Sequence, residues 1–351
     1  MGKIRVLVVD DSITVRKRLV EVLEASDDFE VVGEAGDGKA AIELCSTLRP
    51  DVVTLDMMLP VMTGLAATEY IMAHCPTPIL IVSASVNRGE LFKTYDALAA
   101  GAVDTLDKPT DDDDGWEQRF IAAVKLVSRV KVITHPRLRL GSLGRPQARS
   151  EHPSARPPAS RSIAAVALGA STGGPGAVVD ILRALPAPYP LPILLVMHIG
   201  APFGSAFADW LDTQTPHRVA FARGGEPLSA LAGCVTMAPP EQHMLLRSRT
   251  LQLTSDPPRH SCRPSVDVLF ASLAEELGRS CAACLLTGMG RDGAAGLLAI
   301  RERGGLTIAQ DEATCVVYGM PREAALLGAA ERVLPLGEIG GALAALVRSG
   351  G

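Results

Sequence analysis

The chain has 351 residues, of which 47% are hydrophobic and 21% charged, and a formal net charge of −5. This length favours two domains, and this composition excludes an intrinsically disordered chain. No apolar run approaches the ~18–20 residues that a membrane span requires, and the N-terminus has neither a signal peptide nor a myristoylation pattern. We therefore expect a cytoplasmic protein without membrane insertion.

Short β-branched runs alternate with amphipathic stretches through the first 130 residues. Strands are predicted at 5–9, 31–34, 52–56, 79–83 and 103–106, and helices at 12–25, 39–48, 65–73, 89–99 and 116–130. Ser12 is expected to cap the first helix, because serine is a preferred N-cap residue. Five β/α repeats of this kind predict an α/β fold with a doubly wound, flavodoxin-like parallel sheet.

Polar side chains lie at or just beyond the carboxyl ends of four of these strands: Asp10 and Asp11, Asp56, Ser83, and Lys108. The carboxyl ends of parallel strands meet at one edge of the sheet, where sites form. Three carboxylates brought together repel one another, and a hard cation such as Mg²⁺ relieves that repulsion. Each residue alone could belong to an ordinary turn, but their coincidence at the strand ends favours a phosphoryl-transfer site.

Residues 133–162 interrupt the alternation. From residue 135 onward this segment contains five prolines, six arginines and one glutamate, without a regular apolar period. The arginines could contact nucleic acid, but no aromatic or helical pattern accompanies them, which favours a solvated linker. We therefore predict three segments: a domain at 1–132, a linker at 133–162 and a second domain at 163–349.

The alternation resumes after the linker. Strands are predicted at 164–170, 193–199, 234–238, 281–287, 306–309 and 332–334, and helices at 176–185, 266–277, 292–303 and 322–327. The strands are almost entirely apolar, which is typical of a second, Rossmann-like parallel sheet buried on both faces. Cys281 and Cys284 have redox or zinc spacing, but no second pair completes a site, so buried inert thiols are favoured.

The segment from Gly169 to Pro175 reads G-x-S-x-G at a strand-to-helix turn, the context of a nucleophile elbow with Ser171 at its tip. A serine nucleophile needs a base, and the next strand ends at His198. The base needs an orienting carboxylate, and Asp292 follows a later strand. The order Ser, His, Asp differs from that of α/β-hydrolases, which indicates a convergent triad.

Other interpretations of this segment are weaker. The spacing is not that of a dinucleotide-binding loop, and no Gly-Lys-Ser/Thr of a P-loop is present. A single histidine on an apolar strand is more often a core residue. His198 is distinguished only because Ser171 and Asp292 are also expected at strand ends. The remaining histidines are interpreted as surface or structural: His74, His135, His152, His217, His243 and His260.

Five motifs of the second half resemble the CheB family of chemotaxis protein-glutamate methylesterases and glutamine deamidases. They are Gly169-Ala170-Ser171-Thr172-Gly173-Gly174, Ala238-Pro239-Pro240, Arg263-Pro264-Ser265-Val266-Asp267, Thr287-Gly288-Met289-Gly290-Arg291-Asp292-Gly293 and Gly319-Met320-Pro321. The first half resembles the receiver domain of two-component response regulators. Together the two resemblances cover almost the whole chain.

The resemblance implies a role for each site residue of the second half. Ser171 would be the nucleophile, His198 the base and then the acid, and Asp292 its orienter, with Thr172 and the Met289 amide supporting the oxyanion. Methanol would leave from glutamyl methyl esters of methyl-accepting chemoreceptors and ammonia from glutamines, without a cofactor for this reaction. Met197 and Ile199 depart from the residues common beside the histidine.

For the first half, the resemblance implies phosphorylation of Asp56 by a chemotaxis histidine kinase. Mg²⁺ would be held by Asp10, Asp11, Asp56 and the Met58 carbonyl, with Ser83 as switch hydroxyl and Lys108 as phosphate partner. Thr105 replaces the switching aromatic of many receivers, and Thr63 replaces a common acid. The unphosphorylated receiver would cover the active site of a monomeric enzyme.

The sequence leaves two alternative output functions for the second domain. A second domain without catalysis could only dock receptors or signalling partners, but the intact triad favours the enzyme. A DNA-binding output is disfavoured, because no basic recognition helix follows the linker, so no nucleic-acid partner is expected.

Overall fold

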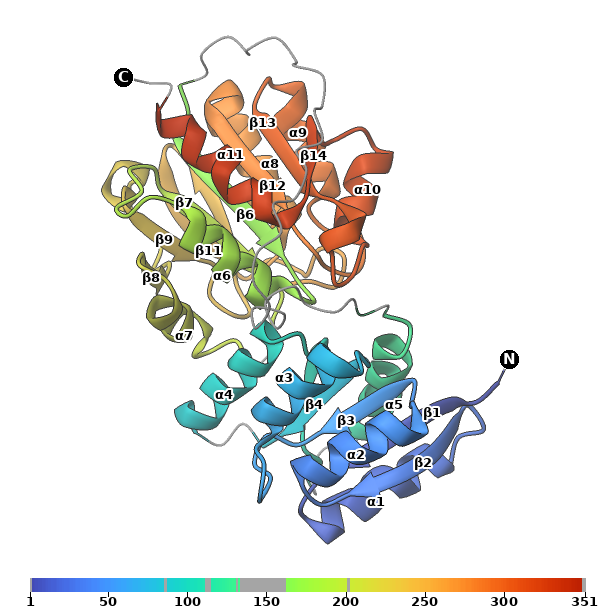
Figure 1. Cartoon of the computed structure of the whole chain (residues 1–351). Coiled ribbons are helices and arrows are strands. Elements are labelled where there is room, and N and C mark those ends of the chain that lie inside the picture. Colours follow the sequence, from blue (N-terminus) through green and yellow to red (C-terminus); the bar gives the residue numbers. More distant parts are fainter. Residues whose placement is uncertain are drawn as a thin grey trace, which may run out of the picture.

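The computed structural model describes residues 2–84, 87–110, 115–130, 132, 162–200 and 203–348. They form two α/β bodies, one above the other in Figure 1, each built on a parallel sheet, which confirms the predicted fold class. Of the predicted linker, only Ser162 lies within the described residues. None of the described helices is long and apolar enough to span a membrane.

The N-terminal domain contains every strand and helix predicted for it. Its sheet has the order β2-β1-β3-β4-β5, all parallel. The strands are β1 (Ile4–Val9), β2 (Phe29–Ala35), β3 (Val52–Leu55), β4 (Ile79–Ser83) and β5 (Asp104–Asp107), and the helices are α1 (Ile13–Glu24), α2 (Gly38–Leu48), α3 (Gly64–His74), α4 (Arg88–Ala99) and α5 (Trp116–Val127).

Side-chain caps define where four of these helices begin. The side chains of Ser12, Asp37, Thr63 and Asn87 each accept a hydrogen bond from a backbone amide of the first turn. Thr63, the residue that departs from the family pattern, therefore has a structural task as the cap of α3.

The C-terminal domain has a seven-stranded parallel sheet in the order β14-β13-β12-β6-β7-β9-β8. Its strands are β6 (Ala165–Ala170), β7 (Ile193–Met197), β8 (Arg218–Phe221), β9 (Cys234–Met237), β12 (Cys281–Leu285), β13 (Leu306–Gln310) and β14 (Arg332–Leu334). The helices are α6 (Gly174–Ala184), α7 (Phe207–Gln214), α8 (Val266–Leu277), α9 (Ala294–Glu302), α10 (Met320–Leu326) and α11 (Leu336–Arg348). The chain leaves β6 toward β7 and later returns to β12 on the other side, so β6 is a topological switch point.

Several elements of this domain were not predicted. The sheet gains the edge strand β8, and an antiparallel hairpin of β10 (His243–Arg247) and β11 (Thr250–Thr254) stands apart from it. The hairpin turns at Ser248 and Arg249, both with positive φ, instead of at a glycine that would mark the turn in the sequence. Helices α7 and α11 were also missed.

Two apolar clusters fill the C-terminal domain. Cys281 belongs to one and Cys284 to the other, so the two thiols point to opposite faces of β12, and both are buried, as predicted. Burial raises the pKa of Cys281 to about 12, which suits an inert core residue.

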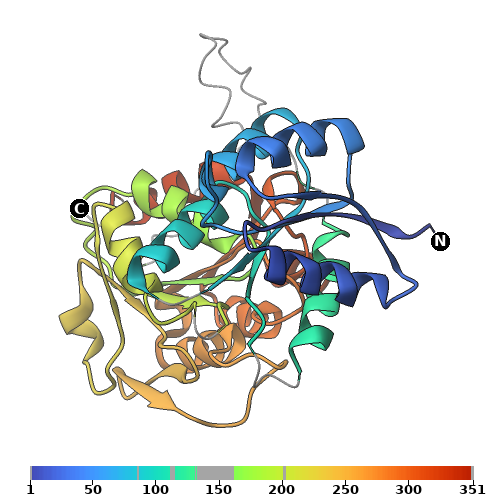
Figure 2. The ribbon, with the colours of Figure 1, turned by 90° about the horizontal axis from the view of Figure 1, so that it is seen from below.

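The two domains meet where α4 packs against α6 and α7 (Figure 1). Figure 2, viewed from below, shows the N-terminal domain lying over one end of the C-terminal domain. Tyr95 is fully buried at this contact, with its ring edge-on to Phe207 at 5.2 Å, and its hydroxyl donates to the Phe203 carbonyl. The Trp210 indole N–H donates to Asp96 at 2.8 Å.

Candidate functional site

Ser171 lies at the turn between β6 and α6, as the elbow motif predicts. Its backbone N–H donates to the Thr287 carbonyl at 3.0 Å, and its carbonyl accepts from the Gly174 amide at 2.7 Å. Gly173 has a φ of 76°, and a Cβ there would lie 2.5 Å from the Val316 side chain. A larger residue at 173 would therefore break the turn that presents the serine.

His198 follows β7 and lies at the strand end beside Ser171, since Ala170 pairs with Met197 in the sheet and the His198 amide donates to the Ala170 carbonyl. Its Nε2 is 2.9 Å from Asp292 Oδ2. Three side chains that are far apart in the sequence thus converge at one edge of the sheet, as the triad prediction requires.

Asp292 is only 2% exposed, and it is held by four donors. Besides His198 it accepts hydrogen bonds from the Ser265 hydroxyl at 2.7 Å and from the amides of Val266 and Asp267, which begin α8. Burial alone would raise the pKa of Asp292, but the hydrogen bonds from His198, Ser265 and Val266 outweigh it and hold the pKa below its usual range. The carboxylate is therefore ionised and fixed in position.

The carboxylate of Asp292 affects the pKa of the His198 imidazole. Burial alone would lower the pKa of His198, but the hydrogen bond to Asp292 and the contact with Cys262 raise it to about 9. Because Nε2–H points at Asp292, Nδ1 is the nitrogen left to accept a proton. Among the hydrogen bonds of the described residues, none joins Ser171 Oγ to His198, and Cys262 Sγ lies 3.8 Å from Nδ1.

The two residues expected to support an oxyanion have different surroundings. Thr172 lines the same cavity as Ser171, and its carbonyl accepts from the Thr287 hydroxyl at 2.9 Å. Met289 is exposed, next to Gly288, where a Cβ would come within 2.7 Å of Ser171 Cβ. The 287–289 segment therefore lies directly against the serine.

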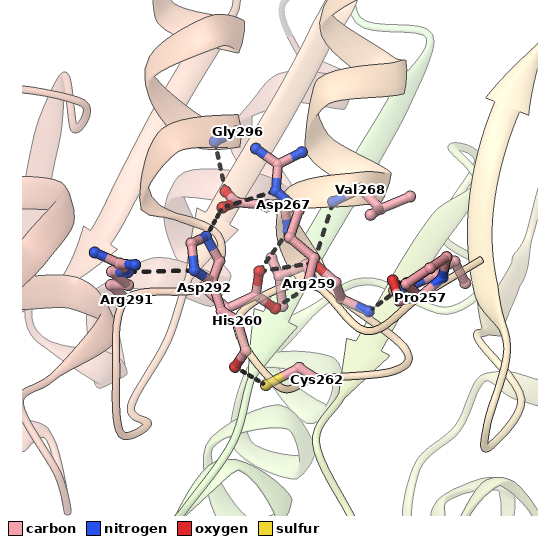
Figure 3. Close-up of polar contacts among 12 residues, drawn as sticks. Pro257, Arg259, His260, Cys262, Asp267, Val268, Arg291, Asp292 and Gly296 are labelled. Atoms are coloured by element: carbon pink, nitrogen blue, oxygen red, sulfur yellow. Dashed lines mark hydrogen bonds and ion pairs between the residues drawn. The ribbon is translucent and has the colours of Figure 1, made fainter. Parts of the chain in front are cut away.

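A tight turn at Arg259–Cys262 was not recognised from the sequence. Arg259 and Cys262 exchange backbone hydrogen bonds, and His260 and Ser261 between them have φ of 53° and 62°. His260 lies between the buried Asp267, at 3.1 Å, and Arg291, whose Nε donates to His260 Nδ1 at 3.2 Å (Figure 3). His260 is therefore structural, as expected, but its task is to fix this turn at the active site.

The acidic site of the N-terminal domain gathers the residues predicted for it. Lys108 Nζ lies 2.9 Å from both Asp10 Oδ2 and Asp56 Oδ2, and carboxylate oxygens of Asp10, Asp11 and Asp56 lie within 4.8 Å of one another. Burial raises the pKa of Asp10 even though Lys108 opposes that shift. Met58 lies in the loop after β3 and is exposed.

These residues fit a magnesium ion and a phosphoryl group. Three carboxylates within a few ångströms are the oxygen donors that Mg²⁺ prefers. The buried Ser83 hydroxyl has no hydrogen-bond partner among the described residues, so it is available to a phosphoryl oxygen.

A cavity of about 600 Å³ lies between the two domains. It is lined by Asp104, Thr105 and Arg119 of the N-terminal domain and by Ser171, His198 and Cys262 of the C-terminal domain. The N-terminal domain therefore forms one wall of the cavity into which Ser171 opens.

Comparisons with known proteins identify a family for each half of the chain. The family described as CheB methylesterase matches residues 166–343, and the response regulator receiver domain matches residues 6–118. A protein-glutamate methylesterase/protein-glutamine glutaminase of Anaeromyxobacter dehalogenans is 44% identical over 98% of this chain and 97% of its own length. One of Nitrosospira multiformis is 42% identical, over 99% and 98%.

A solved structure resembles the second half. The CheB methylesterase catalytic domain of Thermotoga maritima is 35% identical, with a TM-score of 0.50, and the match covers 53% of this chain and 99% of that one.

Proposed function

Because the chain belongs to the CheB methylesterase family, we propose that it hydrolyses glutamate methyl esters and deamidates glutamines of methyl-accepting chemoreceptors in the cytoplasm. Relatives that match it almost end to end are named for both activities. The observation that carries the proposal is the His198–Asp292 pair beside Ser171 at the carboxyl edge of the sheet, where Ser171 and His198 line one cavity.

In this proposal His198 Nδ1 takes the proton of Ser171 as its oxygen attacks the ester carbonyl carbon. Asp292 keeps Nε2–H oriented and stabilises the imidazolium that forms. His198 then gives the proton to the departing methoxide, or to the amine when the substrate is a glutamine. Water hydrolyses the glutamyl-serine ester by the same proton transfers, leaving a glutamate carboxylate and free Ser171.

The negative oxygen of the tetrahedral intermediate needs hydrogen-bond donors. We assign Thr172 and the Met289 amide to this task, and the N-terminus of α6 adds a favourable dipole. The Ser171 amide does not contribute here, because it already donates to Thr287.

The N-terminal domain is proposed to accept a phosphoryl group on Asp56 from a histidine kinase. Bound Mg²⁺, held by Asp10, Asp11, Asp56 and the Met58 carbonyl, would shield the charge of that group. Lys108 would then pair with the phosphate, and the Ser83 hydroxyl would donate to it.

Phosphorylation is proposed to weaken the contact between the domains. Ser83 ends β4, and the next helix, α4, carries Tyr95 and Asp96 into the contact with the C-terminal domain. A shift of Ser83 toward a phosphate would move α4 and open the cavity wall over Ser171.

The test is methanol release from methylated receptor membranes. The wild-type chain should release methanol, and Ser171→Ala should not. Unchanged release by Ser171→Ala would refute the assignment of the nucleophile. Absence of release from folded, phosphorylated wild-type protein would favour a binding regulator.

A further inference from the structure

We propose that His198 and Cys262 form an inhibitory zinc site in the active-site cavity. Cys262 Sγ lies 3.8 Å from His198 Nδ1, and both residues line the cavity that contains Ser171. Ligand atoms of His198, Cys262 and Asp292 lie within 4.8 Å of one another. Imidazole nitrogen and thiolate sulfur are the protein ligands that Zn²⁺ favours.

The distance between the two ligand atoms fits a zinc ion. Zinc binds sulfur at about 2.3 Å and nitrogen at about 2.0–2.1 Å, so two ligands of a tetrahedron lie about 3.6 Å apart. The observed 3.8 Å between Sγ and Nδ1 therefore needs only a small adjustment to hold the ion between them. Water would complete the coordination from the cavity.

Asp292 contributes from outside the coordination sphere. A histidine that binds zinc through one nitrogen usually donates its other N–H to a carboxylate, which orients the ring. His198 has this arrangement, because its Nε2 lies 2.9 Å from the buried carboxylate of Asp292. The Nδ1 lone pair is thereby directed at Cys262.

Cys262 is held in place by the turn at Arg259–Cys262. Two backbone hydrogen bonds close the turn, and His260 ties it to Asp267, which is itself fully buried (Figure 3). The Cys262 thiol also contacts the His260 carbonyl at 3.4 Å. Two consecutive non-glycine residues with positive φ are costly, so the turn is maintained by these contacts and fixes the thiol beside the imidazole.

Cys262 differs from the other cysteines in access to the cavity. Five of the seven are buried, and Cys234, the other partly exposed one, begins β9. Cys234 therefore offers a matched control.

Zinc at this position would stop catalysis by occupying the atom that must take the serine proton. The ion and the Ser171 proton would compete for the same Nδ1 lone pair. The inhibition rests on the proposed function, whereas zinc binding itself does not, so the two can be tested separately.

Binding is tested on the full-length chain in millimolar Mg²⁺, which keeps the acidic cluster of the N-terminal domain occupied. Calorimetry with Zn²⁺, and the thiolate-to-metal absorption band with Co²⁺, report the site in wild type and in Ser171→Ala. Cys262→Ser should weaken Zn²⁺ binding at least tenfold and abolish the Co²⁺ band. The control Cys234→Ser should keep the Zn²⁺ affinity and the Co²⁺ band of wild type. Asp292→Asn should weaken binding about 10- to 100-fold, the usual effect of losing such a carboxylate. Equal Zn²⁺ affinity in wild type and folded Cys262→Ser would overturn the proposal.

Inhibition is tested as the ratio of methanol release with and without Zn²⁺, each variant serving as its own reference. Zn²⁺ should inhibit wild type and Cys234→Ser, and inhibit Cys262→Ser at least tenfold less potently. Equal inhibition of all three would overturn the proposal. If no variant releases methanol but Cys262-dependent binding persists in Ser171→Ala, the proposed function fails and the zinc site stands.

Discussion

Both sites of the chain lie at the carboxyl ends of the strands of a parallel sheet. They differ in how the negative charge of their carboxylates is compensated. In the N-terminal domain, three carboxylates lie close together, and two of them, Asp10 and Asp56, share the ammonium group of Lys108. In the C-terminal domain, the buried carboxylate of Asp292 receives four hydrogen bonds, three of them from the start of α8.

This difference separates a switch from a catalyst. The acidic cluster is under-compensated, so in the proposed function a cation and then a phosphoryl group would change its balance of charge and the position of its neighbours. The Asp292 site is fully compensated, and its charge serves to hold His198 in one orientation. The fold supplies the meeting point of the strand ends, and the side chains decide which behaviour results.

The largest effect is expected from Ser171→Ala. It removes the proposed nucleophile, and methanol release should fall by about 10⁵-fold or more, the size of the loss when a serine hydrolase lacks its nucleophile. Phosphorylation of Asp56 by a small phosphodonor should be unaffected, since the acidic site is separate. Ser280→Ala, at another half-buried serine of the same domain, is the control; a comparable loss there would point to misfolding.

Asp292→Asn should lower kcat by about 10⁴-fold without unfolding the protein. The amide preserves the shape of the side chain but removes the charge that stabilises the imidazolium and fixes its tautomer. Steady-state methanol release measures the effect, with the exposed Asp256→Asn as control. A loss below tenfold would show that Asp292 does not orient the base.

The pH dependence should rise toward alkaline pH. The pKa of His198 is raised to about 9, so the imidazole is protonated at neutral pH and unable to accept the serine proton. Since the neutral fraction falls tenfold for each pH unit below the pKa, kcat/KM should fall about 100-fold between pH 8 and pH 6. A rising limb centred near the ordinary value of 6.5 would contradict the raised pKa.

The smallest effect is expected at the contact between the domains. Asp96→Ala removes the hydrogen bond from the Trp210 indole, worth about 1 kcal/mol, and should raise the activity of unphosphorylated enzyme by roughly fivefold. Asp27→Ala, at an exposed residue of the same domain, should leave activity unchanged. If Asp96→Ala had no effect, this contact would not restrain the enzyme.

Most of what could be predicted from the sequence depends on local pattern. Apolar periodicity and the capping residue Ser12 indicated the elements of the N-terminal domain, and long apolar strands marked most of the second sheet. The meeting of Ser171 with His198 followed from strand order alone, because the ends of parallel strands converge.

Contacts made by irregular backbone could not be predicted in this way. Cys262 lies 64 positions from His198, and its approach depends on a turn whose positive-φ residues are not glycines. The hairpin turn at Ser248 and Arg249 was missed for the same reason. The burial of Tyr95 between the domains could not be predicted either, because one aromatic residue on a helix does not indicate which surface it packs against.

The most direct test of the account is whether phosphorylation in one domain controls hydrolysis in the other. Methanol release from methylated receptor membranes is measured with and without a small phosphodonor and Mg²⁺, for wild type and Asp56→Asn. The account predicts that phosphodonor raises release by the wild-type enzyme and leaves Asp56→Asn at its basal rate. Equal stimulation of both proteins, or stimulation of neither while wild-type Asp56 is demonstrably phosphorylated, would contradict it.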